Sequence, residues 1–162
     1  MVLRREFVRW AEEHNGAGVN RVRIERFEDI EAWQLGRDLT GRVYAVTKIR
    51  PFARDCALTD QIRRAAMSVM HNVAESFDSG SDKEFVRFLS YAQRSCTEVR
   101  SQLYVALDQQ YVSLNQFDEL SDLAREAHAR IGGFIKYLKR SERSATRVPT
   151  KDQGPGTGNA KP

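Results

Sequence analysis

The sequence predicts an all-α protein, an antiparallel up-down-up-down four-helix bundle formed by residues 27–140. Apolar residues recur at helical spacing through four long segments, and none of these segments shows the alternation of a half-buried strand. The connections between the segments are short, which favours antiparallel neighbours. At 162 residues, with 41% hydrophobic and 30% charged residues, the chain is long enough for one soluble domain with a sizeable core.

Residues 1–26 are predicted to be an N-terminal extension, either a docked accessory helix or a poorly ordered arm. The first bundle helix is predicted from Glu28 to Lys48. Ile30, Trp33 and Tyr44 fall almost opposite its core stripe. Because aromatic side chains are costly to leave in water, this side is expected to form an apolar patch, either exposed or covered. Scattered surface aromatics without a role are the alternative.

The second helix, predicted over Leu58–Glu75, has an apolar arc that is too wide for a single core contact. We therefore expect this helix to be buried twice, once within its own subunit and once against another molecule. A ring of identical subunits needs two different patches, and the first two helices supply them. The predicted oligomer interface comprises Ile30, Trp33, Tyr44, Met67, Met70 and Ala74.

The third and fourth helices are placed by capping signals and by their apolar stripes. Ser81 and Glu84 have the spacing of a capping box, which predicts the start of the third helix. Asn115 is predicted to cap the fourth helix, whose stripe ends at Leu138. Residues 141–162 lack apolar periodicity and are rich in Gly, Pro, Thr and Lys. They are predicted to form a disordered basic tail.

The formal net charge of +4 is unevenly distributed. Residues 27–138 hold 14 Lys and Arg against 16 Asp and Glu, whereas residues 139–162 hold six basic and two acidic residues. A nearly neutral body argues against a broad nucleic-acid-binding face, but basic extensions can contact phosphates. The candidate nucleic-acid contacts are Arg63, Lys139, Arg140, Arg143 and Arg147.

The sequence contains none of the catalytic, phosphate-binding or metal-binding motifs considered for a helical bundle. There is no glycine-rich phosphate loop, no nucleophile elbow and no Glu-x-x-His metal motif. We therefore predict a protein that is not an enzyme and that uses no metal and no cofactor. Cys56 and Cys96 are expected to be reduced thiols in the cytoplasm. No apolar run approaches the roughly 20 residues that a membrane span needs, and no secretory signal is expected.

A polar seam flanks the apolar stripes of the second and third helices. If the two flanks face each other, counting outward from the turn places Ser68 near Tyr91 and Arg64 near Glu98. Such a seam either only orients the helices or binds a ligand or partner. A small-ligand pocket at Asn72, Glu75 and Glu98 is a further alternative. The seam comprises Gln61, Arg64, Ser68, Asn72, Glu75, Tyr91, Ser95, Glu98 and Gln102.

Several motifs carry a family resemblance, in the right order along all four helices. The segments FEDIEAW at 27–33, QIRRAA at 61–66 and NVAE at 72–75 resemble four-helix bundle proteins encoded in intervening sequences of large-subunit ribosomal RNA. Lys83-Glu84-Phe85 and the Ser95, Glu98 and Gln102 spacing continue the resemblance, and Ile135-Lys136-x-Leu138 closes it on the fourth helix. Two positions depart from it, because Ser76 and Arg94 stand where the family usually has glycine.

The resemblance has implications for assembly and partners. In architecture the family is similar to the accessory proteins of diversity-generating retroelements, which form rings of five and work with a reverse transcriptase and RNA. It thus implies a homo-pentamer with RNA, a reverse transcriptase or a ribonucleoprotein as partner. We expect a self-associating, non-enzymatic accessory factor associated with RNA or a ribonucleoprotein. The alternative is a protein-interaction or structural module with no nucleic-acid role.

Overall fold

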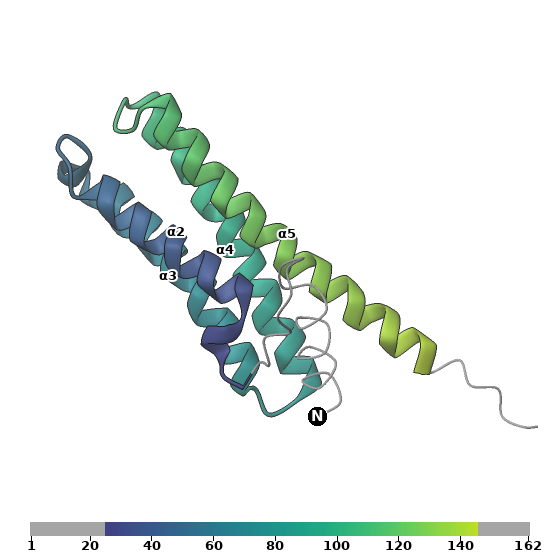
Figure 1. The fold of residues 1–162 in the computed structure, drawn as a ribbon. Helices are drawn as coiled ribbons and strands as arrows, with labels where there is room; N and C mark the ends of the chain where they lie inside the picture. The colour runs from purple at the N-terminus through teal and green to yellow at the C-terminus, as the bar shows by residue number, and fades with distance from the viewer. Residues whose placement is uncertain (1–24, 146–162) are drawn as a thin grey trace, which may run out of the picture.

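The computed structural model describes residues 25–145, and these form an all-α bundle. Its four long helices are α2 (Glu31–Thr47), α3 (Cys56–Asp78), α4 (Asp82–Asp108) and α5 (Leu114–Ala145). Short 3₁₀ helices, η1 (Phe27–Asp29) and η2 (Phe52–Arg54), precede α2 and α3. Consecutive long helices run in opposite directions, and α2 also packs against α5, which closes the bundle (Figure 1). The predicted fold class is confirmed.

The four predicted apolar stripes meet in one core. Each fully buried Leu, Ile or Phe in it contributes roughly 1.5–3 kcal/mol to stability. All four long helices contribute, so the core ties the elements together along their length. Its largest fully buried side chains are Leu39, Val43, Phe52, Ile62, Val69, Val73, Phe85, Leu89, Leu103, Ile131 and Phe134.

Three helices begin at side-chain caps. Asp55 accepts a hydrogen bond from the Leu58 N–H (3.0 Å), and Ser81 accepts one from the Glu84 N–H (3.3 Å), as the sequence predicted for α4. At α5, however, Ser113 accepts from the Gln116 N–H (3.2 Å), and Gln116 accepts from the Ser113 N–H (2.9 Å). The prediction that Asn115 caps this helix is therefore wrong.

The C-terminal boundary of the bundle also differs from the prediction. Helix α5 continues to Ala145, so the predicted start of the tail at residue 141 is too early. The rest of the predicted tail, like residues 1–24, lies outside the described residues.

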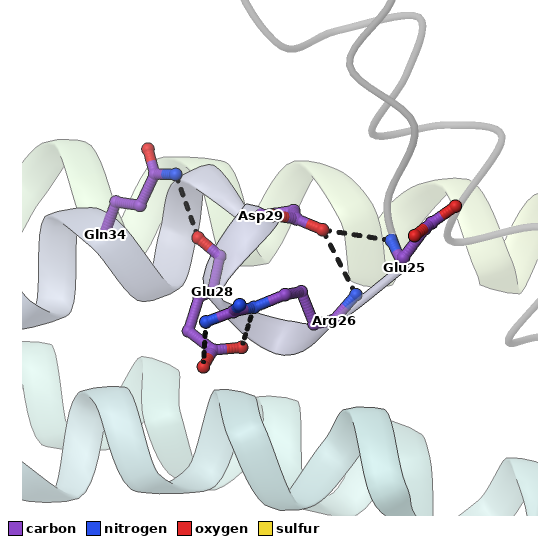
Figure 2. Close-up of polar contacts among 5 residues, drawn as sticks. All are labelled: Glu25, Arg26, Glu28, Asp29 and Gln34. Atoms are coloured by element: carbon purple, nitrogen blue, oxygen red, sulfur yellow. Dashed lines mark hydrogen bonds and ion pairs between the residues drawn. The ribbon is translucent and has the colours of Figure 1, made fainter.

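Hydrogen bonds just before α2 fix the FEDIEAW segment, as Figure 2 shows. The Asp29 carboxylate accepts from the N–H groups of Glu25 (3.0 Å) and Arg26 (3.1 Å). The Gln34 amide donates to the Glu28 carbonyl (2.9 Å). Two side-chain hydrogen bonds, of 2.9 and 2.6 Å, also join Arg26 to Glu28. The first α-helix therefore begins at Glu31, after a 3₁₀ turn, rather than at Glu28.

This turn covers residues that were expected to face outward. Ile30 is only 2% exposed and Trp33 only 9% exposed. The Phe27 ring packs edge-on against Trp33, with ring centroids 5.2 Å apart, and η1 contacts both α2 and α3. Of the two alternatives, an exposed or a covered patch, the structure therefore shows a covered one at Ile30 and Trp33, and the cover is the preceding turn, which a helical wheel of α2 does not include.

One glycine sets the distance between α2 and α3. A Cβ added at Gly36 would lie 3.1 Å from the Met70 backbone nitrogen and 3.1 Å from a Val69 methyl carbon. Gly41, five residues later in the same helix, has nothing within 4 Å of such a Cβ. The two backbones therefore approach closely at Gly36, where a side chain would not fit without a shift.

The end of the bundle that carries the α2–α3 and α4–α5 connections is held by an aromatic pair (Figure 1). Phe52 of η2 is fully buried, and its ring stacks on Tyr111 with centroids 5.1 Å apart. Tyr111 belongs to the α4–α5 connection, so the stack joins two segments far apart in sequence. The α3–α4 turn lies at the opposite end.

Candidate functional site

The α2–α3 contact holds several residues of the predicted oligomer interface. The Tyr44 hydroxyl lies 3.5 Å from the Met67 sulfur, and the Arg63 guanidinium lies 4.6 Å above the Tyr44 ring. Met70 and Ala74 are half-buried and pack against the core. The wide apolar arc of the second helix is thus largely covered by α2 of the same subunit. An interface between copies at these residues stays a prediction. The surplus apolar surface that led to this prediction is covered within one subunit and so does not support it.

Arg63 also has a structural role that the sequence did not indicate. Its Nε donates to the Thr47 hydroxyl (2.8 Å), and Thr47 is fully buried at the end of α2. With its face on Tyr44, the guanidinium is engaged within the subunit. Arg63 is therefore a poor candidate for the phosphate contact proposed from sequence.

The polar seam does face inward between α3 and α4, with a register that differs from the prediction. The Ser95 hydroxyl donates to the Ser68 hydroxyl (2.9 Å), so Ser68 lies opposite Ser95 rather than Tyr91. The Asn72 amide completes the link, donating to the Ser68 carbonyl (2.8 Å) and hydroxyl (2.9 Å). The difference is one helical turn, and a shift of one turn leaves the same faces in contact. The sequence pattern cannot distinguish the two registers.

The rest of the seam lies nearer the surface. Arg64 and Glu98 are both exposed, and within residues 25–145 no ion pair joins them, contrary to the pairing considered from sequence. Glu98 instead accepts from the Gln102 amide on its own helix (3.2 Å). Tyr91 is 42% exposed, and Gln61 and Glu75 are also exposed. The part of the seam that the structure brings together is a helix-orienting contact.

A groove of about 390 Å³ lies between α4 and α5. The Gln93 amide crosses it to donate to the His128 carbonyl (3.4 Å), and Lys136 and Lys139 are exposed at its edge. Gly132 is the close neighbour of Gln93, because an added Cβ would meet the Gln93 amide nitrogen at 2.5 Å. The groove is lined by Gln93 of α4 and by His128, Ala129, Gly132, Gly133, Ile135, Lys136 and Lys139 of α5.

The groove is electrostatically positive. None of its lining residues carries a carboxylate, although residues 27–138 hold more acidic than basic residues. Burial lowers the pKa of His128 from its ordinary value, and the nearby charge of Arg100 lowers it further. Both causes favour the neutral imidazole over its charged form, so the groove owes its positive charge to Lys136 and Lys139.

A second groove, of about 210 Å³, lies between α2 and α5 and differs in charge. Its cation, Arg42, donates to the Asp38 carboxylate (3.1 Å) and approaches Glu119 (3.9 Å). Because carboxylates neutralise Arg42, this groove presents no free positive charge.

Of the basic residues proposed from sequence, Lys139 lines the groove between α4 and α5. Arg140 and Arg143 belong to α5, but their side chains lie outside the described part of the chain, and Arg147 lies wholly outside it. Sequence reasoning missed Gln93, His128 and Lys136 as a set. A periodicity argument considers one helix at a time, whereas this groove forms only where two helices meet.

Comparison with known proteins decides the family. The family model described as 23S rRNA-intervening sequence protein matches residues 28–133, about two thirds of the chain. The chain belongs to this family. The match covers most of the groove between α4 and α5 but ends before Lys136 and Lys139.

A solved structure supports the fold of this family member. It is described as a protein with unknown function from the S23 ribosomal protein family of Bacteroides thetaiotaomicron VPI-5482. The two chains are 17% identical, and their similarity covers 65% of this chain and 95% of the other, with a TM-score of 0.61. No curated protein matches the chain. The solved structure therefore supports the fold of the family member and leaves its function open.

The remaining chemical groups of this family member are its cysteines and the side chains that could hold a metal. Within residues 25–145, no three His, Cys, Asp or Glu side chains cluster closely enough to hold a metal. Cys96 is fully buried, and burial raises the pKa of its thiol to about 12, whereas Cys56 is exposed. No helix in the same part of the chain combines the length and the apolar character that crossing a bilayer requires.

Proposed function

We propose that this family member is a non-enzymatic accessory factor associated with RNA or a ribonucleoprotein. The observation that carries the proposal is the match of residues 28–133 to the 23S rRNA-intervening sequence proteins. Some polar side chains between the helices hydrogen-bond one another within the bundle, so these contacts stabilise the fold. Ser68, Ser95 and Asn72 form one such set, and Arg63 and Thr47 form another.

RNA that co-purifies with the full-length protein tests this proposal. Ultraviolet cross-linking followed by sequencing should recover RNA from the protein but not from an unrelated helical bundle of similar charge. Binding should weaken steeply as salt rises, because each phosphate contact releases counterions. Recovery at background level, together with no binding in low salt, would refute the proposal.

The second candidate is a protein-interaction module without a nucleic-acid role. It is favoured by apolar side chains at the end of the bundle that holds the Phe52–Tyr111 stack. Ile49 is 60% exposed, Tyr104 54% and Leu114 64%, and Val105 is also exposed. If these side chains form one contiguous surface, that surface suits an apolar partner. A partner held there would be nearly insensitive to salt, which distinguishes it from RNA.

Self-association belongs to the same proposal. The pentamer implied by the resemblance to retroelement accessory proteins remains a prediction, as does a reverse-transcriptase partner. Light-scattering mass in solution tests the pentamer directly. A monomeric mass at micromolar concentration would remove self-association from the proposal while leaving RNA association intact.

A further inference from the structure

We propose that the groove between α4 and α5 binds the phosphodiester backbone of single-stranded RNA. The inference rests on the proposed function and deepens it, because it names the surface and the chemical group recognised. Lys136 and Lys139 would contact phosphate oxygens, and the Gln93 amide would lie across the floor of the groove.

Lys136 and Lys139 are both free to contact a phosphate. Both side chains are exposed, and none of the ion pairs formed by residues 25–145 includes either of them. Being three residues apart on one helix, they share a face, with Cβ atoms about 5–6 Å apart. Two neighbouring cations on one rim suit a charged chain better than a single small anion.

The walls of this groove differ in charge from other surfaces, where arginines are paired with carboxylates. Arg42, in the groove between α2 and α5, is neutralised by Asp38 and Glu119, and Arg87 and Arg125 lie within ion-pair distance of Glu84 and Asp122 on their own helices. The groove between α4 and α5 has no carboxylate on its walls. An anionic polymer would therefore meet no carboxylate on the walls of this groove, whereas the groove between α2 and α5 has Glu119 on its wall.

Small residues in α5 give the groove room for an extended chain. Gly132 brings the α5 backbone against Gln93, and a side chain at this position would displace the Gln93 amide. Gly132 and Ala129 therefore keep the groove open between His128 and the lysines. A groove of about 390 Å³ with small residues along its floor can accept a backbone, whereas base-specific recognition would need more directed polar groups.

The test uses the full-length chain and a fluorescein-labelled single-stranded RNA of mixed sequence, with anisotropy measured from about 50 to 200 mM salt. The test variant is K136A/K139A. The matched control is K48A/R54A, which removes the same charge from exposed positions near the other end of the bundle. Alanine favours helix, so the α5 substitutions should leave the fold intact, as circular dichroism would verify.

The salt dependence gives the expected size of the effect. Each phosphate contact on a single strand contributes about 0.7 to the slope of log affinity against log salt, so losing two contacts lowers the slope by about 1.4. Between about 50 and 200 mM salt, the wild type should lose about sevenfold more affinity than K136A/K139A. The control should retain the slope of the wild type.

A second pair of variants tests charge separately from shape. A129E places a carboxylate on the floor of the groove, and A129Q places a neutral side chain of similar size there. Weaker RNA binding by A129E than by A129Q supports the inference, and an equal effect overturns it. Competition by polyglutamate as strong as that by RNA would also overturn it, because the groove would then select any polyanion, including an acidic protein.

The outcomes separate this inference from the proposed function. If the wild type binds RNA and K136A/K139A behaves like K48A/R54A, the groove is not the site, although RNA association stands. If the wild type binds no RNA at low salt, both the inference and the proposed function fail.

Discussion

Replacing Gly36 by alanine should destabilise the bundle relative to the same replacement at Gly41. Both glycines lie within α2, so both substitutions gain the helix propensity of alanine, about 0.8–1.0 kcal/mol. At Gly41 the new methyl group meets nothing within 4 Å. At Gly36 it would lie 3.1 Å from the Met70 nitrogen and 3.2 Å from the Met70 Cα. These backbone atoms belong to the middle of α3 and cannot move aside as a side-chain tip would.

The magnitude follows from the difference between the two variants. The propensity gain cancels in this difference, which leaves the cost of forcing a methyl group between packed helices, about 1–3 kcal/mol. G41A should therefore be more stable than the wild type by up to about 1 kcal/mol. G36A should be less stable than G41A by about 1–3 kcal/mol, which corresponds to roughly 3–15 °C in Tm for a domain of this size.

Urea denaturation followed by circular dichroism provides the measurement. Equal m-values for the two variants would show that only the stability has changed. If G36A proved as stable as G41A, the close approach of α2 and α3 at this position would be refuted. The account of Gly36 as the residue that sets the helix spacing would then be abandoned.

Four further predictions concern the seam, the reactivity of the two thiols, the ionisation of Cys96 and the histidine. S95A should lower the free energy of unfolding by about 0.5–1.5 kcal/mol in urea titrations. The double variant S68A/S95A should lose less free energy of unfolding than the two single variants lose together, since both substitutions remove the same hydrogen bond. A thiol reagent at pH 8 should label Cys56 in the native protein and Cys96 only after unfolding. The raised pKa of Cys96, about 12, also predicts that stability declines as pH rises above about 9, where only the unfolded thiol ionises. NMR titration should give His128 a pKa below 6.5. Stability should fall as pH drops below this value, because the unfolded chain then binds the proton more readily than the folded chain. A native pKa at or above 6.5 would contradict both statements.

The sequence was sufficient for the helices but not for how they pair. Periodicity located the four stripes and the Ser81 cap, since these are properties of single segments. The register of α3 against α4 was wrong by one turn, because facing stripes repeat at nearly that interval. Ser113 was missed as a cap because Asn115, also a good capping residue, lies two positions later.

The sites were harder to predict than the fold. The helical wheel of α2 places Trp33 opposite the core stripe because it does not include η1, which folds over this residue. The groove between α4 and α5 joins Gln93 to residues more than thirty positions later, so no local motif marks it. The excess of basic residues in 139–162 predicted Lys139 as a candidate contact.

An even number of antiparallel helices leaves both described chain ends at the same end of the bundle, opposite the Phe52–Tyr111 stack (Figure 1). The lysine-bearing part of α5 lies towards those ends, whereas Cys56 begins α3 at the stacked end. Immobilisation on a biosensor through the Cys56 thiol would therefore hold the protein by the stacked end and leave Lys136 and Lys139 facing the solution.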